Sequence, residues 1–195
     1  MNTVRGGHSL MIAALAALVL CLPPGGRAQN LIANADFAKS PDEAWTISST
    51  EDEPAIALQS GEPNAISVRQ ALRGYTVLSQ LIPIKTLDLD FSFSAMFVAS
   101  VNKPNFTALS EVVVGYYSAD TGLLGQTRFC RAVNRGDLKS GPDQHLIPVK
   151  ADSSWDDYTV NLKKDVMDYL SAVKPSQVAL IKLSLSADNG KDEGC

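Results

Sequence analysis

Histidine and cysteine are scarce in this sequence, with two histidines and three cysteines among 195 residues. A zinc centre needs several such ligands at close spacing, and a Ser-His or Cys-His hydrolase needs a paired nucleophile and base. There is no Gly-x-Ser-x-Gly elbow, and His145, the one histidine after residue 28, stands in a loop flanked by prolines. We therefore expect a solvated His145, no catalytic residues, no metal ligands of this kind and no enzyme activity.

A long apolar run is also missing. The longest, LMIAALAALVLCL near the N-terminus, is too short to cross a bilayer, and no cluster of positive residues follows it. A weakly positive start with Arg5 precedes this run, and the small residues Gly26 and Ala28 follow it. This pattern is typical of a secretory signal peptide, residues 1–28, cleaved before Gln29. Leu20 precedes Cys21 where a lipid-anchored precursor needs a small residue, so we expect a plain cleaved signal. The mature chain, 29–195, is expected to be secreted or periplasmic, with no membrane span.

Basic residues are too few for a surface that binds nucleic acid. Without Arg5 and Arg27 of the leader, 15 basic residues remain against 21 acidic ones, and the formal net charge changes from −4 to −6. Nucleic-acid binding depends on clustered Lys and Arg, so we expect no such partner. The 167 residues of the mature chain suit one domain with a full core.

The mature chain is rich in the alternation that is typical of strands. In TLDLDFSFSAMFVAS (86–100), apolar residues alternate with Asp and Ser, which predicts a strand with one buried face and one wet face. EVVVGYYS, the turn ADTG and QTRFCRAV together predict a hairpin over 111–133. Further strands are predicted at 65–70, 75–82, 155–162 and 178–186. Many short strands separated by Gly, Pro, Asn and Asp residues predict an all-β sandwich or barrel.

One helix and one long loop interrupt the strands. Apolar residues at helical spacing predict a short helix near 165–173, with Asp165 as its cap and Pro175 after its end. We expect this helix to cover one open end of the sandwich. The segment 134–154 is expected to be an exposed loop, in which the tripeptide RGD is too short and common to indicate an adhesion motif.

These segments, taken in order, resemble a known family. NLIANADF and then Trp45, AISVRQ, VLSQLIPI, LDFSFSAMF, VVVGYYSADTG, WDDYTVNL and VALIKLSLSA are similar to the jelly-roll carbohydrate-binding modules of secreted cellulases and xylanases. That family is a branch of the galactose-binding-like β-sandwiches. The resemblance covers nearly the whole mature chain and implies a jelly-roll β-sandwich that binds a polysaccharide or glycan without catalysis.

The sequence departs from the family at three places. Ala35 replaces the usual glycine of the opening NGDF, and the segment 125–154 is longer than the family's connection. Only DNGKDEGC follows LSLSA, where the family has a last strand. Either the sequence is truncated or the sandwich lacks its final strand.

A sugar site needs flat aromatic rings for the apolar faces of pyranoses and polar side chains for their hydroxyls. The candidate ligand-binding residues are Tyr117, Trp45, Tyr75, Gln80 and Arg128. Trp45 and Trp155 stand where the family buries a tryptophan, so packing in the core is the favoured alternative for each. Neighbouring strand residues face opposite sides, and parity with the valines before it predicts Tyr116 in the core and Tyr117 as the platform.

Two acidic features leave alternatives open. Asp88 and Asp90 share a strand face about 6.5 to 7 Å apart, which suits a glycosidase acid and base but arises on any wet strand face. The wet face is the favoured interpretation. The family resemblance also allows a structural calcium ion at Asp36 or Asp42, although the carboxylate of the family's last strand is missing here. No other cofactor is expected.

The two cysteines of the mature chain, Cys130 and Cys195, are expected to form a disulfide in an oxidising compartment. Two unpaired thiols are the alternative, because spacing alone does not bring two cysteines together. The alternative function is a structural or protein-interaction β-sandwich of the cell envelope or matrix, without a sugar ligand. The sequence does not indicate an oligomeric state.

The signal-peptide prediction has a direct test. Expressed with its own leader in a bacterial host, the protein is expected outside the cytoplasm with Gln29 as its first residue. N-terminal sequencing of the exported protein checks this. An exported protein that retains Met1 would contradict the prediction.

Overall fold

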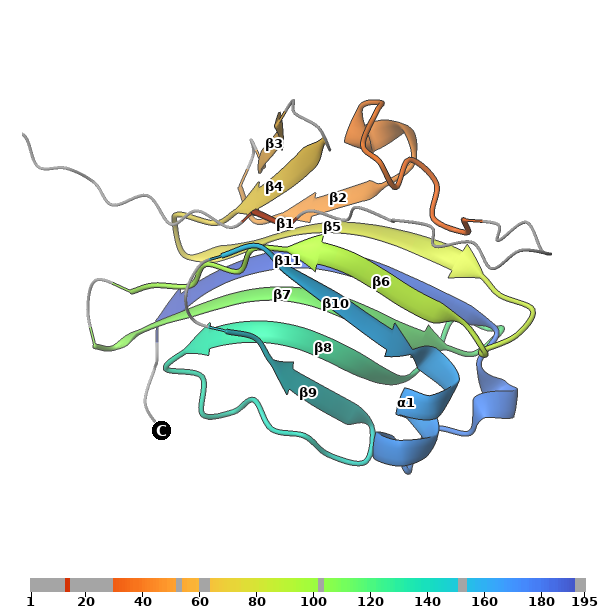
Figure 1. Ribbon diagram of the computed structural model, residues 1–195. Coiled ribbons are helices and arrows are strands. Elements are labelled where there is room, and N and C mark those ends of the chain that lie inside the picture. Colours follow the sequence, from red (N-terminus) through yellow and green to blue (C-terminus); the bar gives the residue numbers. More distant parts are fainter. Residues whose placement is uncertain are drawn as a thin grey trace, which may run out of the picture.

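The protein is an all-β sandwich with a short α-helix (Figure 1). The computed structural model describes residues 13–14, 30–51, 54–59, 64–101, 104–150 and 154–191. Its strands are β1 (Ala13–Ala14), β2 (Thr46–Ser49), β3 (Ala55–Gln59), β4 (Ala65–Arg69), β5 (Gly74–Pro83), β6 (Asp90–Ala95), β7 (Phe106–Tyr117), β8 (Leu123–Val133), β9 (Gln144–Pro148), β10 (Asp156–Asn161) and β11 (Leu180–Lys191). The helical elements are η1 (Pro41–Glu43), α1 (Leu162–Tyr169) and η2 (Pro175–Gln177). Within the described ranges, no helix is both long enough and apolar enough to cross a membrane.

The larger layer is a six-stranded sheet with the order β2-β5-β11-β7-β8-β9. Its central strand β11 pairs antiparallel with β5 on one side and with β7 on the other. β7 and β8 form the predicted hairpin, with a register shift between Tyr116 and Tyr117. Only β9 runs parallel to its neighbour β8 among the strand pairs of this sheet in the described chain.

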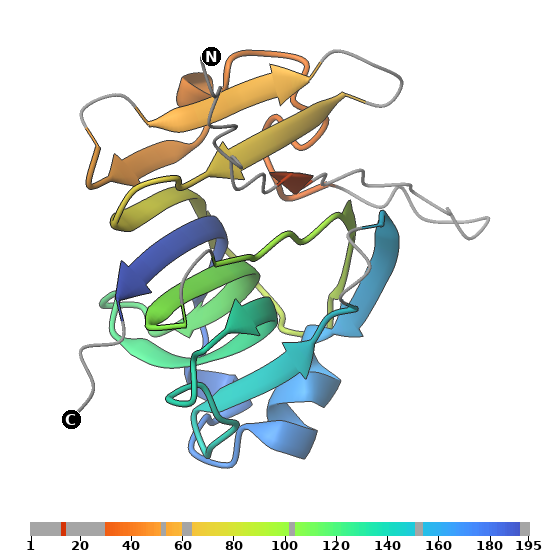
Figure 2. The same cartoon turned by 90° about the vertical axis from the view of Figure 1, so that its left-hand side faces the viewer.

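The second layer is built from two smaller sheets. β6 pairs with β10, and β4 pairs with β3 and with β1, which belongs to the predicted signal peptide. β6 and β10 cross in front of the six-stranded sheet in Figure 1, and β3 and β4 lie at one end of the molecule in Figure 2. Buried residues of both layers form one hydrophobic cluster, so the core lies between them.

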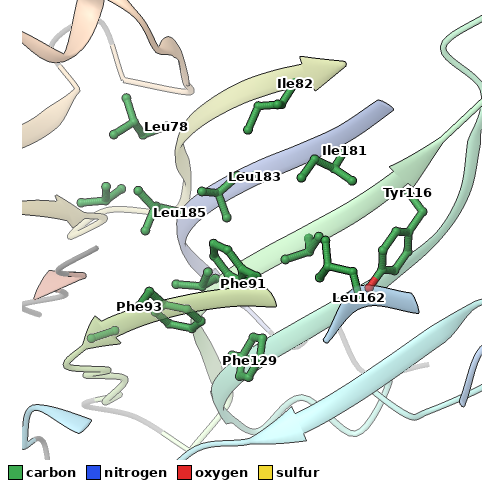
Figure 3. Close-up of a cluster of buried hydrophobic side chains, with 14 of the residues drawn as sticks. Leu78, Ile82, Phe91, Phe93, Tyr116, Phe129, Leu162, Ile181, Leu183 and Leu185 are labelled. Atoms are coloured by element: carbon green, nitrogen blue, oxygen red, sulfur yellow. The ribbon is translucent and has the colours of Figure 1, made fainter. Parts of the chain in front are cut away.

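Strand alternation decides which side chains enter this core. On β11, Ile181, Leu183 and Leu185 point into the core (Figure 3), and Lys182 and Ser184 between them belong to the opposite face. The apolar residues of the segment 86–100 behave as predicted, since its phenylalanines and Leu87 are buried.

Aromatic rings join the two layers. Phe93 of β6 stacks on Tyr158 of β10 with ring centroids 5.1 Å apart, and it meets the ring of Phe129 edge to face at 5.0 Å. Phe129 belongs to β8 of the larger sheet, so these contacts bind the β6-β10 pair to it. Such pairs add about 0.5–1.5 kcal/mol each beyond the burial of their surface.

A helix forms close to the predicted range 165–173, but α1 begins at Leu162 and ends at Tyr169, and its cap is another residue than predicted. α1 begins after Asn161, whose side-chain oxygen accepts a hydrogen bond from the amide of Lys164 at 3.0 Å. Asp165, the predicted cap, lies a turn later and is buried at 4 % exposure. The capping prediction was wrong because the β10 strand runs directly into the helix at Asn161. Val166, Leu170 and Val173 are buried as the helical spacing predicted, although Leu170 and Val173 follow the end of α1. Tyr169, the fourth residue of the predicted apolar stripe, is 56 % exposed instead.

The predicted loop 134–154 contains a strand. β9 lies within it and pairs with β8, with Thr127 opposite His145 and Phe129 opposite Ile147. The loop prediction was therefore wrong for this part. A five-residue strand that ends in proline has too little periodicity to be recognised alone, and its neighbour in the sheet identifies it.

The RGD tripeptide precedes β9, and its arginine and aspartate side chains pair with each other. The Arg135 guanidinium donates to both carboxylate oxygens of Asp137, at 3.0 and 3.1 Å, and also to Asp188 of β11 at 3.0 Å. This mutual pairing lowers the pKa of the Asp137 carboxyl. Arg135 thus connects the loop to the sheet through Asp188, and Asp137 pairs with Arg135 within the loop.

The central position of β11 predicts a large stability difference between two leucines. Leu185→Ala removes a side chain that is 2 % exposed and is expected to lower the free energy of unfolding by about 2–5 kcal/mol. Leu58→Ala, at a position 46 % exposed on β3, is expected to change it by at most about 0.5 kcal/mol. Urea unfolding followed by circular dichroism measures both. If both variants lost the same free energy of unfolding, β11 would not be the centre of the core.

Candidate functional site

The face of the six-stranded sheet that points away from the core carries a groove of about 200 Å³. Its floor and walls come from β5, β11, β7 and β8. The lining residues alternate with core residues along these strands and comprise Val77, Glu111, Val113, Gly115, Tyr117, Gln126, Lys182, Ser184 and Ser186. The groove follows the paired strands β7 and β11, and the six strand steps from Glu111 to Tyr117 span about 20 Å.

Tyr117 forms one end of this groove and leans over Gly115. A Cβ atom at Gly115 would lie 2.8 Å from Cε2 of the Tyr117 ring and 3.6 Å from its Cζ. The ring therefore occupies the space that a side chain at position 115 would fill, and it lies along the sheet. Gly115 is the residue type that this arrangement requires, and the sequence alone did not indicate that role.

Tyr116 has the opposite orientation. It is fully buried, and the ring of Tyr116 points into the core in Figure 3. The predicted face assignment of these two tyrosines is confirmed. Desolvation, as the largest cause, raises the pKa of the Tyr116 hydroxyl, which therefore stays protonated at any ordinary pH.

A buried ion pair closes the other end of the groove. Nη2 of Arg128 lies 2.5 Å from Oε2 of Glu111, and Nε of Arg128 donates to the same oxygen at 2.8 Å. The second oxygen of Glu111 accepts from the Ser186 hydroxyl at 2.8 Å, and Arg128 also donates to Gln144 at 3.0 Å. Their side chains are only 13 % and 10 % exposed. Arg128 therefore lies behind the groove residue Glu111 and does not line the groove, and its donors are directed to Glu111 and Gln144.

Gln144 extends this network to the edge of the sheet. Its Oε1 accepts from Gln126 at 2.7 Å as well as from Arg128, and its amide nitrogen donates to the backbone oxygen of Lys139. The polar side chains on this side of the groove are thus held in place by one another, which is the arrangement that a selective polar site requires.

Cys130 lies beside this ion pair, opposite Glu111 in the register of β7 and β8. Burial, together with the negative charge of Glu111, raises the pKa of its thiol. The structure has Cys130 as a free cysteine, and Cys195 lies outside the described residues. The disulfide therefore stays a prediction.

The predicted ligand-binding residues do not all meet at one site. Tyr117 lines the groove, and Arg128 is bonded to the groove residue Glu111. Tyr75, 41 % exposed, pairs with Asp188 on β11, at the end of the sheet beyond Ser186. It does not line the groove.

Trp45 and Gln80 belong to the buried side of the sheet. Trp45 is 4 % exposed, and its ring packs against Phe37 with centroids 5.6 Å apart. Gln80 bonds the backbone of Ala33 through both its oxygen and its nitrogen and donates to the carbonyl of Ala44. The two were wrong as ligand-binding candidates, because they attach the N-terminal segment to β5. Trp155, by contrast, is 43 % exposed rather than buried.

A second polar cluster lies directly behind the groove, on the core side. Asp165 of α1, whose side chain is 2 % exposed, accepts from Thr127 and from the Tyr116 hydroxyl at 3.3 Å. Its other oxygen lies 2.7 Å from Nδ1 of His145, and the His145 ring stacks on Tyr169 at 3.9 Å. The prediction of a solvated loop histidine was wrong. Only the pairing of β9 with β8 brings His145 to Asp165.

The other acidic candidates lie away from the groove. Asp88 and Asp90 both accept hydrogen bonds from the side-chain amide of Asn161, at 3.3 and 3.0 Å. Asp36 accepts from the amide of Ala38, and Asp42 accepts from the Ser40 hydroxyl. Across the described ranges there is no group of three or more His, Cys, Asp or Glu residues that could hold a metal ion.

The chain was also compared with known proteins. No protein-family model matches it, and no curated protein matches it.

The Asp165 cluster generates a stability prediction with a matched control on the same helix. Asp165→Ala leaves His145 and the buried hydroxyls without their acceptor, at a cost of about 1–3 kcal/mol for a buried donor left unpaired. Asp168→Ala, at an exposed position three residues later, is expected to be nearly neutral. Thermal unfolding compares the two variants. A stable Asp165→Ala variant would show that the cluster does not hold α1 to the sheet.

Proposed function

We propose that this chain is a secreted, non-catalytic carbohydrate-binding module of the jelly-roll type, which binds a polysaccharide or glycan in the groove between Tyr117 and Glu111. The observation that carries the proposal is the Tyr117 ring, which lies over Gly115 at the end of an open groove. The apolar face of a pyranose packs on such a ring, and sugar hydroxyls need donors and acceptors beside it. Gln126, Ser184 and Ser186 line the groove with such groups.

The size of the groove favours a polymer over a small enclosed ligand. Enclosed ligand sites have volumes of roughly 300–1,000 Å³, and this groove has about 200 Å³. An extended chain can pass along an open groove and place one or a few units in it. Its polar walls are also held rigid by the Glu111 to Gln144 network, which lowers the entropy cost of binding.

Glu111 supports a binding role over a hydrolytic one. Among the described residues that line the groove, Glu111 is the one with a carboxylate. One of its oxygens accepts from Arg128 and the other accepts from Ser186. Glycoside hydrolysis uses two carboxyl groups that flank the scissile bond and exchange protons with it. A carboxylate held by a guanidinium is poorly suited to either role.

A scaffold for a protein partner is the alternative. Leu81 and Leu123, 48 % and 55 % exposed, pair in register with Lys182 and Tyr117 at the same end of the groove. Exposed apolar residues around an aromatic ring also suit a protein interface. Polysaccharide binding distinguishes the two functions.

The proposal predicts that Tyr117→Ala keeps the fold and weakens polysaccharide binding by about 1–3 kcal/mol, because stacking on the ring is lost. Tyr75→Ala, on the same face but outside the groove, is expected to bind as the wild type does. Tyr116→Ala is expected to lose about 3–5 kcal/mol of stability, since it empties a fully buried site.

Affinity electrophoresis in gels that contain soluble glucans or xylans, combined with thermal melting, measures binding and folding separately. If the wild type is not retarded by any polysaccharide, the glycan proposal fails and the protein-interaction scaffold replaces it. Binding that survives in Tyr117→Ala would remove Tyr117 from the site.

A further inference from the structure

Lys182 is the one charged side chain of the groove lining that is left without a partner within the described chain. Glu111 and Arg128 neutralise each other. Beyond the groove, Arg135 pairs with Asp137 and Asp188. Lys182 has no such interaction, and it lies half-buried in the wall. The groove therefore carries a single net positive charge in a chain whose formal net charge is −4.

The register of the sheet places this charge beside the aromatic ring. Lys182 lies opposite Gly115, the residue that the Tyr117 ring covers, and Gln126 lies opposite Gly115 on its other side. Neighbouring strands are about 4.8 Å apart. A sugar ring packed on Tyr117 would thus have the ammonium group at one edge and an amide at the other.

A half-buried ammonium group has lost part of its hydration, and an anionic partner compensates for that loss better than a neutral hydroxyl does. The overall negative charge of the protein repels acidic polymers at long range, so binding of an anion would depend on this local cation. The remaining polar side chains of the groove, Gln126, Ser184 and Ser186, carry donors and acceptors that suit the hydroxyl groups of a sugar.

We propose that the groove selects an acidic polysaccharide, whose carboxylate or sulfate group pairs with Lys182 while its sugar ring packs on Tyr117. This inference rests on the proposed glycan-binding function and narrows its ligand class. Uronic acid units and sulfated sugars share the required chemistry, an anionic group at the edge of a pyranose ring.

Isothermal titration calorimetry tests the proposal with four probes: polygalacturonate, dextran sulfate, dextran and hydroxyethylcellulose. We expect at least one acidic polymer to bind more tightly than both neutral ones, with an affinity that falls as salt is raised. Lys182→Met keeps the side-chain stem and removes the charge. This variant is expected to bind the acidic polymer with about tenfold lower affinity, because one charge-assisted contact is lost. Lys182→Arg is expected to retain binding.

Lys163→Met, at an exposed position on α1, controls for the overall change in net charge. Tight binding of polygalacturonate alone identifies the carboxylate, and tight binding of dextran sulfate alone identifies the sulfate. If a neutral polymer binds as tightly as the acidic ones, or Lys182→Met and Lys163→Met weaken binding equally, the acidic-ligand inference is wrong and the glycan-binding function stands. If neither acidic nor neutral polymers bind, the proposed function itself fails.

Discussion

The pairing of β11 between β5 and β7 is the interaction on which the rest of the structure depends. A strand paired on both sides is held by hydrogen bonds along both edges, and its side chains alternate strictly between the two faces. Ile181, Leu183 and Leu185 therefore enter the core, and Lys182 and Ser184 line the groove. A shift of one residue in this register would exchange the two sets. Core and groove are thus two consequences of one register.

The same rule connects the groove with the buried cluster behind it. Tyr117 and Gln126 line the groove, and their chain neighbours Tyr116 and Thr127 bond Asp165 on the core side. On β9, Gln144 bonds Arg128 while the adjacent His145 bonds Asp165. Two polar networks therefore lie back to back across three strands. The inner one anchors α1 to the sheet, and the outer one positions polar groups toward solvent.

The ion pair of Glu111 and Arg128 fixes the positions of the side chains at one end of the groove, and its net contribution to the stability of the fold is small. Removing two charges from water costs several kcal/mol for each ion, and the attraction between them roughly returns that cost when every hydrogen bond is made. Here both oxygens of Glu111 and the donors of Arg128 have partners. The pair therefore stays intact at the sheet surface and gives the groove a rigid polar end.

The sequence by itself determined the elements whose signal is local. Alternation identified the β7-β8 hairpin and the orientation of Tyr116 and Tyr117, because strand periodicity is a property of the residues within one strand. Helical spacing likewise identified α1. The all-β sandwich followed from these patterns together.

Tertiary structure alone decided the contacts between distant segments. His145 meets Asp165 and Asp165 meets Thr127 across 20 and 38 residues, and Gln80 reaches Ala33 across 47. No periodicity encodes such pairs, since they depend on which strands become neighbours in the sheet. For the same reason β9 could not be recognised without its neighbour β8. The need for glycine at position 115 could not be predicted either, because it depends on the Tyr117 ring that lies over it.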